Sequence, residues 1–205
     1  MQVQIFSSIH IPLPLEAIYR RLGYKSGITK IDERKREEIE RHIEYAASLV
    51  CLKGAGLRVP LERVEPTQVF LATGADIRSA KLAGFLKGCR EVLFVGSTAG
   101  SAVMDAIRGD IEGDDMTRGV VIDAVASEMT DAALDWIMGL FNRLLARENA
   151  RLTRARFSAG YGDFLLENQK MMYDMLELGR IGVTINENCI LIPEKSVTAV
   201  VGIHA

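Results

Sequence analysis

Residues 114–151 read DDMTRGVVIDAVASEMTDAALDWIMGLFNRLLARENAR and decide the fold class of this chain. Apolar side chains recur in this stretch with a period of about 3.6 residues, and no proline interrupts it. The apolar positions are Val121, Ile122, Val125, Met129, Ala132, Ala133, Trp136, Ile137, Leu140, Phe141, Leu144 and Leu145. The stretch therefore predicts one long helix, or two nearly collinear helices, beginning near Asp114 or Asp115 and ending near Arg151.

Short strands and shorter helices are expected before this long helix. The sequence predicts a strand over 1–6, a short helix over 15–22 and a charged amphipathic helix over 31–52. Gly54 and Gly56 are expected to end the amphipathic helix. The next elements are expected to be strands over 57–65 and 68–73, a helix capped by Asp76 and ending at Gly88, a strand over 91–96 and a helix over 101–108.

A loop, a helix and closing strands are expected after the long helix. Residues 152–164 predict the loop, 165–178 the helix, and alternation around Val183 and Val197 two or three strands, with Pro193 at an edge or turn. Long helices between clusters of short strands are typical of an α+β domain with a mainly antiparallel or mixed sheet. A length of 205 residues favours one domain, at most two.

Composition and charge exclude several classes of protein. Lys plus Arg is 25 and Asp plus Glu is 27, so the net charge of −2 argues against a general nucleic-acid binder. No run of about 18 uncharged apolar residues predicts a membrane span, and the first residues lack the basic start of a signal peptide. The three cysteines are far apart, so we expect small buried thiols in a reducing cytoplasm.

Two motifs allow a functional and a structural interpretation. Residues 91–100 form an apolar strand followed by glycines, which could cradle a phosphate or form a plain strand-to-helix turn capped by Ser97 or Thr98. Four carboxylates within six residues could hold a divalent cation or simply begin a helix. These carboxylates belong to Asp110, Glu112, Asp114 and Asp115. The three histidines lack metal-ligand spacing, and no hydrolase motif is present, so neither a catalytic residue nor a metal ligand is assigned.

The most unusual run is 154–163, RARFSAGYGD. The guanidinium of Arg156 offers a planar fork for a carboxylate, and Gly160 and Gly162 allow backbone to approach a ligand closely. Phe157 and Tyr161 offer aromatic faces for a ring or a cation. This combination would suit a small zwitterion that carries a ring and a positive charge; the alternative is an ordinary ordered loop.

This run also carries a family resemblance. Arg156-x-Ser158-x-Gly160-Tyr161, followed by Lys170, Ile181–Gly182, Glu187 and Pro193-x-x-Ser196–Val197, resembles the activation domain of cobalamin-dependent methionine synthase, which binds S-adenosylmethionine. The resemblance is strongest over 110–203, where Asp114–Asp115 opens the long helix as in that module, and residues 1–205 would form one such domain. Ile192 replaces the family's tryptophan before proline, and Phe157, Ala159 and Gly162 stand where prolines are usual.

The resemblance implies a fold and a binding site. The fold would be a single curved α+β domain with a twisted, mainly antiparallel sheet flanked by long helices. Arg156 would meet the carboxylate of S-adenosylmethionine, Ser158, Ala159 and Gly160 would hold adenine or ribose, and Tyr161 would lie where the methyl donor faces the corrinoid. An acidic residue near the N-terminus would bind the amino group, with Asp32 as the candidate. Glu187 and Ser196 match the family as structural residues.

The resemblance also implies a function. The chain would be a stand-alone cytoplasmic component that positions S-adenosylmethionine for the reductive remethylation of cob(II)alamin on a separate methionine synthase subunit. A flavodoxin-like protein would be the electron donor, and no nucleic-acid or membrane partner is expected. The basic residues Arg143, Arg147, Arg151 and Arg154 could steer an acidic donor or be a solvated helix end. Two alternatives remain: a regulatory module that only binds S-adenosylmethionine, and an activator of another corrinoid methyltransferase.

Overall fold

A seven-stranded sheet lies at the centre of the molecule, and all its strand pairings are antiparallel among the described residues. The computed structural model describes residues 2–24, 28–29, 32–113 and 115–204. The strand order is β4-β3-β2-β5-β9-β6, and β1 pairs with β2. The strands are β1 (Gln4–Phe6), β2 (Lys53–Glu65), β3 (Gln68–Leu71), β4 (Asp76–Arg78), β5 (Glu91–Thr98), β6 (Arg151–Leu152) and β9 (Ser196–His204). Strands β7 (Thr184–Ile185) and β8 (Leu191–Ile192) form a separate hairpin.

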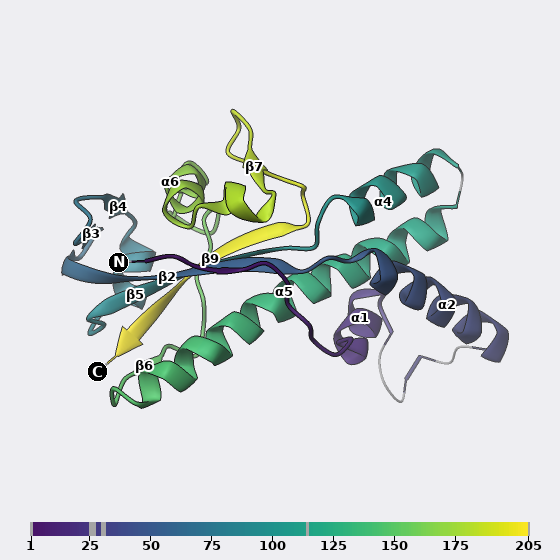
Figure 1. The fold of residues 1–205 in the computed structure, drawn as a ribbon, viewed down its shortest axis with the longest axis horizontal. Coiled ribbons are helices and arrows are strands. Elements are labelled where there is room, and N and C mark those ends of the chain that lie inside the picture. Colours follow the sequence, from purple (N-terminus) through teal and green to yellow (C-terminus); the bar gives the residue numbers. More distant parts are fainter. Residues whose placement is uncertain (1, 25–27, 30–31, 114, 205) are drawn as a thin grey trace.

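Helices cover both faces of this sheet. The long helix α5 (Met116–Ala146) runs along one face, while α6, the short turn η1 and the β7–β8 hairpin lie on the other (Figure 1). Helices α1, α2 and α4 gather around the first half of α5 at one end of the molecule. The remaining helices are α1 (Leu15–Arg21), α2 (Glu33–Leu49), α3 (Ala80–Phe85), α4 (Ala102–Glu112), α6 (Asn168–Met175) and η1 (Leu178–Ile181). No helix in the described ranges is long and apolar enough to cross a membrane.

Strand β5 separates two hydrophobic cores. Leu93 and Val95 pack into the core that contains α5, whereas Val92 and Phe94 pack into the core that contains α6. Successive side chains of a strand point to opposite faces, so a strand buried on both sides reads as a continuous apolar run. This explains why residues 92–95 carry no polar alternation.

The glycines after α2 lie inside a strand, so the prediction that they end the helix is wrong. Helix α2 ends at Leu49, and Gly54 and Gly56 belong to β2. A Cβ at Gly54 would lie 2.5 Å from Ile137 Cδ1, and one at Gly56 would lie 2.4 Å from Phe141 Cε2. The missing side chains therefore allow α5 to pack directly on the backbone of β2.

Helix α5 confirms the prediction of one long helix. The Asp115 side chain accepts a hydrogen bond from the backbone N–H of Arg118 and caps the helix; Asp114 lies outside the described residues. The helix ends at Ala146, five residues earlier than predicted, because the chain turns at Asn149, whose φ is 56°. Arg151 and Leu152 then pair with β9 instead of continuing the helix.

Several smaller predictions need correction. Asp76 does not cap a helix: Ile77 is buried in β4 opposite Val69, and Ser79 caps the short helix α3. Ser97 and Thr98 do not cap α4, because β5 extends to Thr98. The helix over 165–178 is shorter, Asn168–Met175, and η1 follows it.

Two predicted element ends lie outside the described residues, and the cysteines are more exposed than predicted. Met1 and Ile31, the predicted first residues of a strand and a helix, lie outside the described residues. Cys51 is exposed in the connection between α2 and β2, and Cys89 and Cys189 are half-buried, so the prediction of buried thiols is wrong. All three cysteines are free.

Candidate ligand-binding site

Strand β9 has one edge that is only partly covered. It pairs with β5 over Ser196–Ile203, but on its other edge it pairs with β6 near its end and with Phe157 at Val200. Val200 exchanges both backbone hydrogen bonds with Phe157. Because pairing alternates along an antiparallel strand, the backbone N–H and C=O of Thr198 also point away from β5. The beginning of β9 therefore presents backbone polar groups at an edge that the loop 153–164 does not pair with.

A cleft of about 510 Å³ lies at this edge of β9. It is formed by α5, the loop 153–164, α6 and the beginning of β9. Its lining residues are Asp131, Arg156, Phe157, Ser158, Ala159, Tyr161, Gln169, Ser196, Val197 and Thr198. A second hollow of about 230 Å³ shares Asp131, Tyr161, Ser196 and Val197 with it, so the cleft continues past the exposed Tyr161 ring.

Four of the five site residues predicted from the sequence line this cleft. They are Arg156, Ser158, Ala159 and Tyr161. The fifth, Gly160, shapes the turn: its φ is +89°, in the left-handed region that favours glycine, and its N–H donates to the Phe164 carbonyl at 2.7 Å. The structure thus brings the predicted residues together around one concave surface.

Asp163 anchors the loop that carries these residues to the beginning of α3. Its carboxylate accepts hydrogen bonds from the Ser79 hydroxyl at 2.6 Å and the Ala80 N–H at 2.7 Å, at the beginning of α3. These donors hold the pKa of Asp163 below its ordinary value. Phe157 adds apolar anchoring, since its ring lies 5.9 Å from that of Phe85 and 6.1 Å from that of Phe164. The loop is therefore a preformed wall of the cleft.

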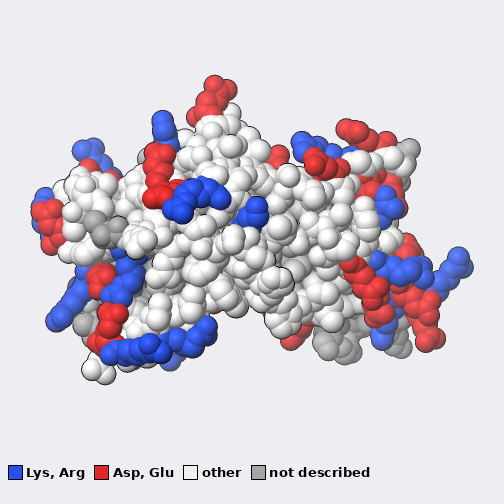
Figure 2. Space-filling view, viewed as in Figure 1, with Lys and Arg blue, Asp and Glu red and all other residues white. Residues whose placement is uncertain are grey.

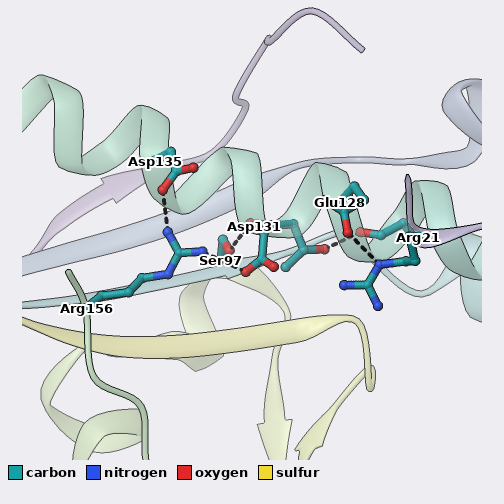
Figure 3. Close-up of polar contacts among 8 residues, drawn as sticks. Arg21, Ser97, Glu128, Asp131, Asp135 and Arg156 are labelled. Carbon is teal, nitrogen blue, oxygen red and sulfur yellow. Dashed lines mark hydrogen bonds and ion pairs between the residues drawn. The ribbon is translucent and has the colours of Figure 1, made fainter. Parts of the chain in front are cut away.

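Arg156 is paired with two carboxylates of α5. Its guanidinium forms ion pairs with Asp131, at 2.9 Å, and with Asp135. Figure 3 shows Asp135, Asp131 and Glu128 in a row along α5, with Arg156 at one end and Arg21 at the other. Arg21 pairs with Glu128 at 2.5 Å. Residues three or four apart lie on one face of a helix, so α5 carries an acidic row, of which Asp131 lines the cleft.

The two charged side chains that line the cleft have opposite signs, which favours a ligand that carries both charges. They are Arg156 and Asp131, whereas Asp135, the second partner of Arg156, lies outside the cleft lining. A guanidinium has five N–H donors, so Arg156 can bind a further carboxylate while it keeps its aspartate partners. The Asp131 side chain is 45% exposed and can accept hydrogen bonds from an ammonium group.

Asp32, the acidic residue that the resemblance suggested for the ligand's amino group, lies outside this cleft. Asp32 caps α2, where its side chain accepts the Lys35 N–H at 2.9 Å, and it does not line the cleft. Asp131 is the acidic residue that lines it. Glu128, Asp131 and Asp135 are spaced three and four positions apart, which places them on one face of the long helix. The sequence interpretation of this helix considered only its apolar face.

The two residues that the resemblance matched as structural differ in position. Glu187 is exposed between β7 and β8. Ser196 lines the cleft, and its hydroxyl donates to Thr98 Oγ1 at 2.8 Å. Ser196 therefore holds the beginning of β9 against β5 and also faces the cleft.

The remaining polar motifs have structural partners. Asp110 is buried and pairs with Arg118 through an Nε–Oδ2 contact of 2.8 Å, which lowers the pKa of Asp110. Within the described ranges, no group of three His, Cys, Asp or Glu side chains could hold a metal ion.

The basic residues near the end of the long helix face solvent, and Figure 2 shows basic side chains gathered where α5 ends. The exposed residues are Arg143, Arg147, Arg151 and Arg154.

Comparison with known proteins shows a shared fold. No family model and no curated protein matches the sequence. A solved structure, "Crystal Structure of the MetH Reactivation Domain bound to AdoHcy", matches with a TM-score of 0.69 at 12% identity, over 98% of this chain and 78% of that chain. This chain has the MetH reactivation-domain fold. The expectation of a curved, mainly antiparallel α+β domain is thereby confirmed. At this identity the likeness to the MetH domain concerns the fold alone.

Proposed function

We propose that the cleft binds S-adenosylmethionine and that the protein is the reactivation component of a cobalamin-dependent methionine synthase. One observation carries the proposal: four sequence-predicted ligand residues line a single cleft in a chain with the fold of a MetH domain that was solved with AdoHcy. AdoHcy is S-adenosylmethionine without its transferable methyl group. S-adenosylmethionine carries one more positive charge than AdoHcy, on its sulfonium sulfur.

The chemistry of the two walls suggests how the ligand lies. Arg156 would bind the carboxylate, and Asp131 would accept hydrogen bonds from the ammonium group. Phe157 and Ala159 provide an apolar surface for the adenine ring, and Ser158 provides a hydroxyl for the ribose. Tyr161, 69% exposed, would stand beside the sulfonium methyl where the cleft opens to a partner.

The proposed role is one of positioning. The cobalamin of a separate subunit would supply the methyl acceptor after reduction by an electron donor, for which a flavodoxin-like protein is the candidate. Holding the sulfonium methyl in line with its acceptor is what this chain would contribute. The exposed arginines where α5 ends would attract an acidic donor. Three free cysteines support a cytoplasmic setting.

The test is calorimetric titration of S-adenosylmethionine into the wild-type protein, Arg156→Ala and Arg154→Ala. We expect wild-type binding, and a loss of about 2–4 kcal/mol in Arg156→Ala, because the ligand carboxylate would lose its charged partner. Arg154 is exposed on the same loop and serves as the matched control, whose affinity should not change. Absence of wild-type binding would refute the proposed ligand, and equal affinity of all three would refute the assignment of Arg156.

A further inference from the structure

Gln169 is a buried polar residue in the cleft. It lies on α6, is 9% exposed, and lines the cleft. Its Oε1 accepts a hydrogen bond from the Thr198 hydroxyl at 2.9 Å. Most buried polar side-chain atoms have a hydrogen-bond partner. The question is therefore what the amide nitrogen, Nε2, binds.

The contact with Thr198 determines which end of the amide faces the cleft. The Thr198 hydroxyl has a single proton, and its alternative acceptor, Met172 Sδ, is 3.8 Å away and weak. The Thr198 hydroxyl therefore donates its proton to Gln169 Oε1, the stronger of the two acceptors. With Oε1 engaged by Thr198, Nε2 keeps two N–H donors and no acceptor, and it is the end of this cleft-lining amide that is left to bind a ligand.

The position of Gln169 indicates which part of a ligand it meets. Gln169 stands on the α6 side of the sheet, as do Phe157 and Ala159, which pack with the core of that side. The charged groups of Arg156 and Asp131 stand on the α5 side. A ligand that places its amino-acid end on the charged wall must place its ring system on the apolar wall, beside Gln169.

We infer that Gln169 is a specificity-determining residue that donates a hydrogen bond from Nε2 to an acceptor atom in the nucleoside part of the ligand. The inference rests on the proposed function, because the ligand must be an adenosyl compound. Thr198 acts as a positioning residue that sets the direction of the donor. A ring nitrogen or a ribose oxygen would serve as the acceptor.

The test compares two ligands across four proteins. S-adenosylmethionine has both the nucleoside and the amino-acid part, whereas 5′-methylthioadenosine lacks the amino-acid part. Affinities are measured by NMR titration, which also reads weak binding, for the wild type, Gln169→Met, Thr198→Val and Arg156→Ala. Methionine matches glutamine in length and lacks the donor. Thermal unfolding of each variant shows whether the fold is retained.

Gln169→Met should lose about five- to tenfold in affinity for both ligands, the size of one hydrogen bond. Arg156→Ala should lose affinity for S-adenosylmethionine only. Thr198→Val should show a smaller loss of affinity for both ligands, since the Gln169 amide is then free to rotate. This variant tests the use of the Gln169 donor if Gln169→Met unfolds.

Three results would overturn the inference. Wild-type affinity for both ligands in Gln169→Met, or in Thr198→Val if Gln169→Met unfolds, would show that the donor is not used. A loss with S-adenosylmethionine but not with 5′-methylthioadenosine would move Gln169 to the amino-acid end. If the wild type binds neither ligand, the proposed function fails first and this inference fails with it.

Discussion

Arg156, the residue proposed to bind the ligand carboxylate, already has a fixed position in this structure. Its two aspartate partners on α5 fix the guanidinium at the edge of the cleft, and its side chain is only 26% exposed. A preorganised cation loses little side-chain entropy when it binds a carboxylate. The acidic partners also offset its positive charge, which in the proposed site would disfavour simple anions and favour ligands with their own cationic group.

Tyr161→Ala should separate binding from methyl transfer. The Tyr161 side chain is largely exposed at the mouth of the cleft, so its loss should change the Kd for S-adenosylmethionine by no more than about twofold. If the ring orients the sulfonium methyl, methyl transfer to free cob(I)alamin should slow by about tenfold or more. Calorimetry and the absorbance of the cobalamin measure the two quantities. Equal losses in both would contradict the proposed position of Tyr161.

Asp163 should make the stability of the protein depend on pH. The Ser79 hydroxyl and the Ala80 and Lys81 N–H groups lower its pKa in the folded state, so the ionised form stabilises the fold. This contribution is fully present above the unfolded pKa of about 4 and is lost as pH falls through the folded value. Asp163→Asn should therefore lower the unfolding temperature above about pH 5, and the difference from wild type should shrink below about pH 4.

The control for this prediction is Asp174→Asn. Asp174 is exposed on α6, and replacing it removes one carboxylate without touching the contacts of Asp163 with Ser79 and Ala80. A difference between Asp163→Asn and wild type that stays constant from pH 3 to pH 7 would show that the carboxylate charge does not contribute.

Sequence reasoning found the residues of one loop and missed their partners. Arg156, Gly160 and Tyr161 stand within six positions of one another, so their combined chemistry is visible in a single run. Asp131 lies 25 positions before Arg156, inside a helix interpreted through its apolar face. Contacts between residues so far apart depend on tertiary packing, which local periodicity does not encode.

Strand β2 and helix α5 are packed more closely than side chains would permit. At Gly54 the nearest backbone atom to an added Cβ is the Gly96 carbonyl oxygen at 2.8 Å, and Ile137 Cδ1 is nearer still at 2.5 Å. A carbonyl in the middle of a sheet cannot move aside without disturbing the pairing of β2 with β5.

Gly54→Ala should therefore destabilise the protein by about 1–3 kcal/mol, the usual cost of overpacking a core. Urea denaturation gives the free energy of unfolding. Gly84→Ala is the matched control, since Gly84 lies in α3 with no atom within 4 Å of an added Cβ, and alanine there should be neutral or stabilising by up to about 1 kcal/mol. Equal stability of the two variants would contradict the packing argument.

The elements with strong periodicity were predicted well, and the short ones were not. Helix α5 has enough turns for its apolar stripe to stand out over 31 residues. Residues 76–88 divide into β4 and α3, and Asp76 and Ser79 are both suitable caps, so only the pairing of Ile77 with Val69 decides between them. Glycine signals also mislead where glycine serves close packing, as in β2, instead of a helix end.

At the scale of the whole molecule, the cleft lies where the two layers meet at the edge of the sheet. Helix α5 contributes the charged wall, α6 and the loop 153–164 contribute the apolar wall, and β9 contributes the floor. Four segments must be in place for the cleft to form, and of these only the loop 153–164 and α6 are neighbours in the sequence. The general fold was predictable because its periodic elements and the family resemblance agreed. The set of residues that forms the cleft could be identified only from the structure.

The most direct test of the central claim is to map the binding of S-adenosylmethionine on the amide resonances of the isotopically labelled protein. We expect saturable shifts at 156–161, at 196–198 and at Asp131, with little change at the distant end formed by α2 and α4. Shifts confined to that distant end, or no shifts at millimolar ligand, would contradict the claim that this cleft is an S-adenosylmethionine site.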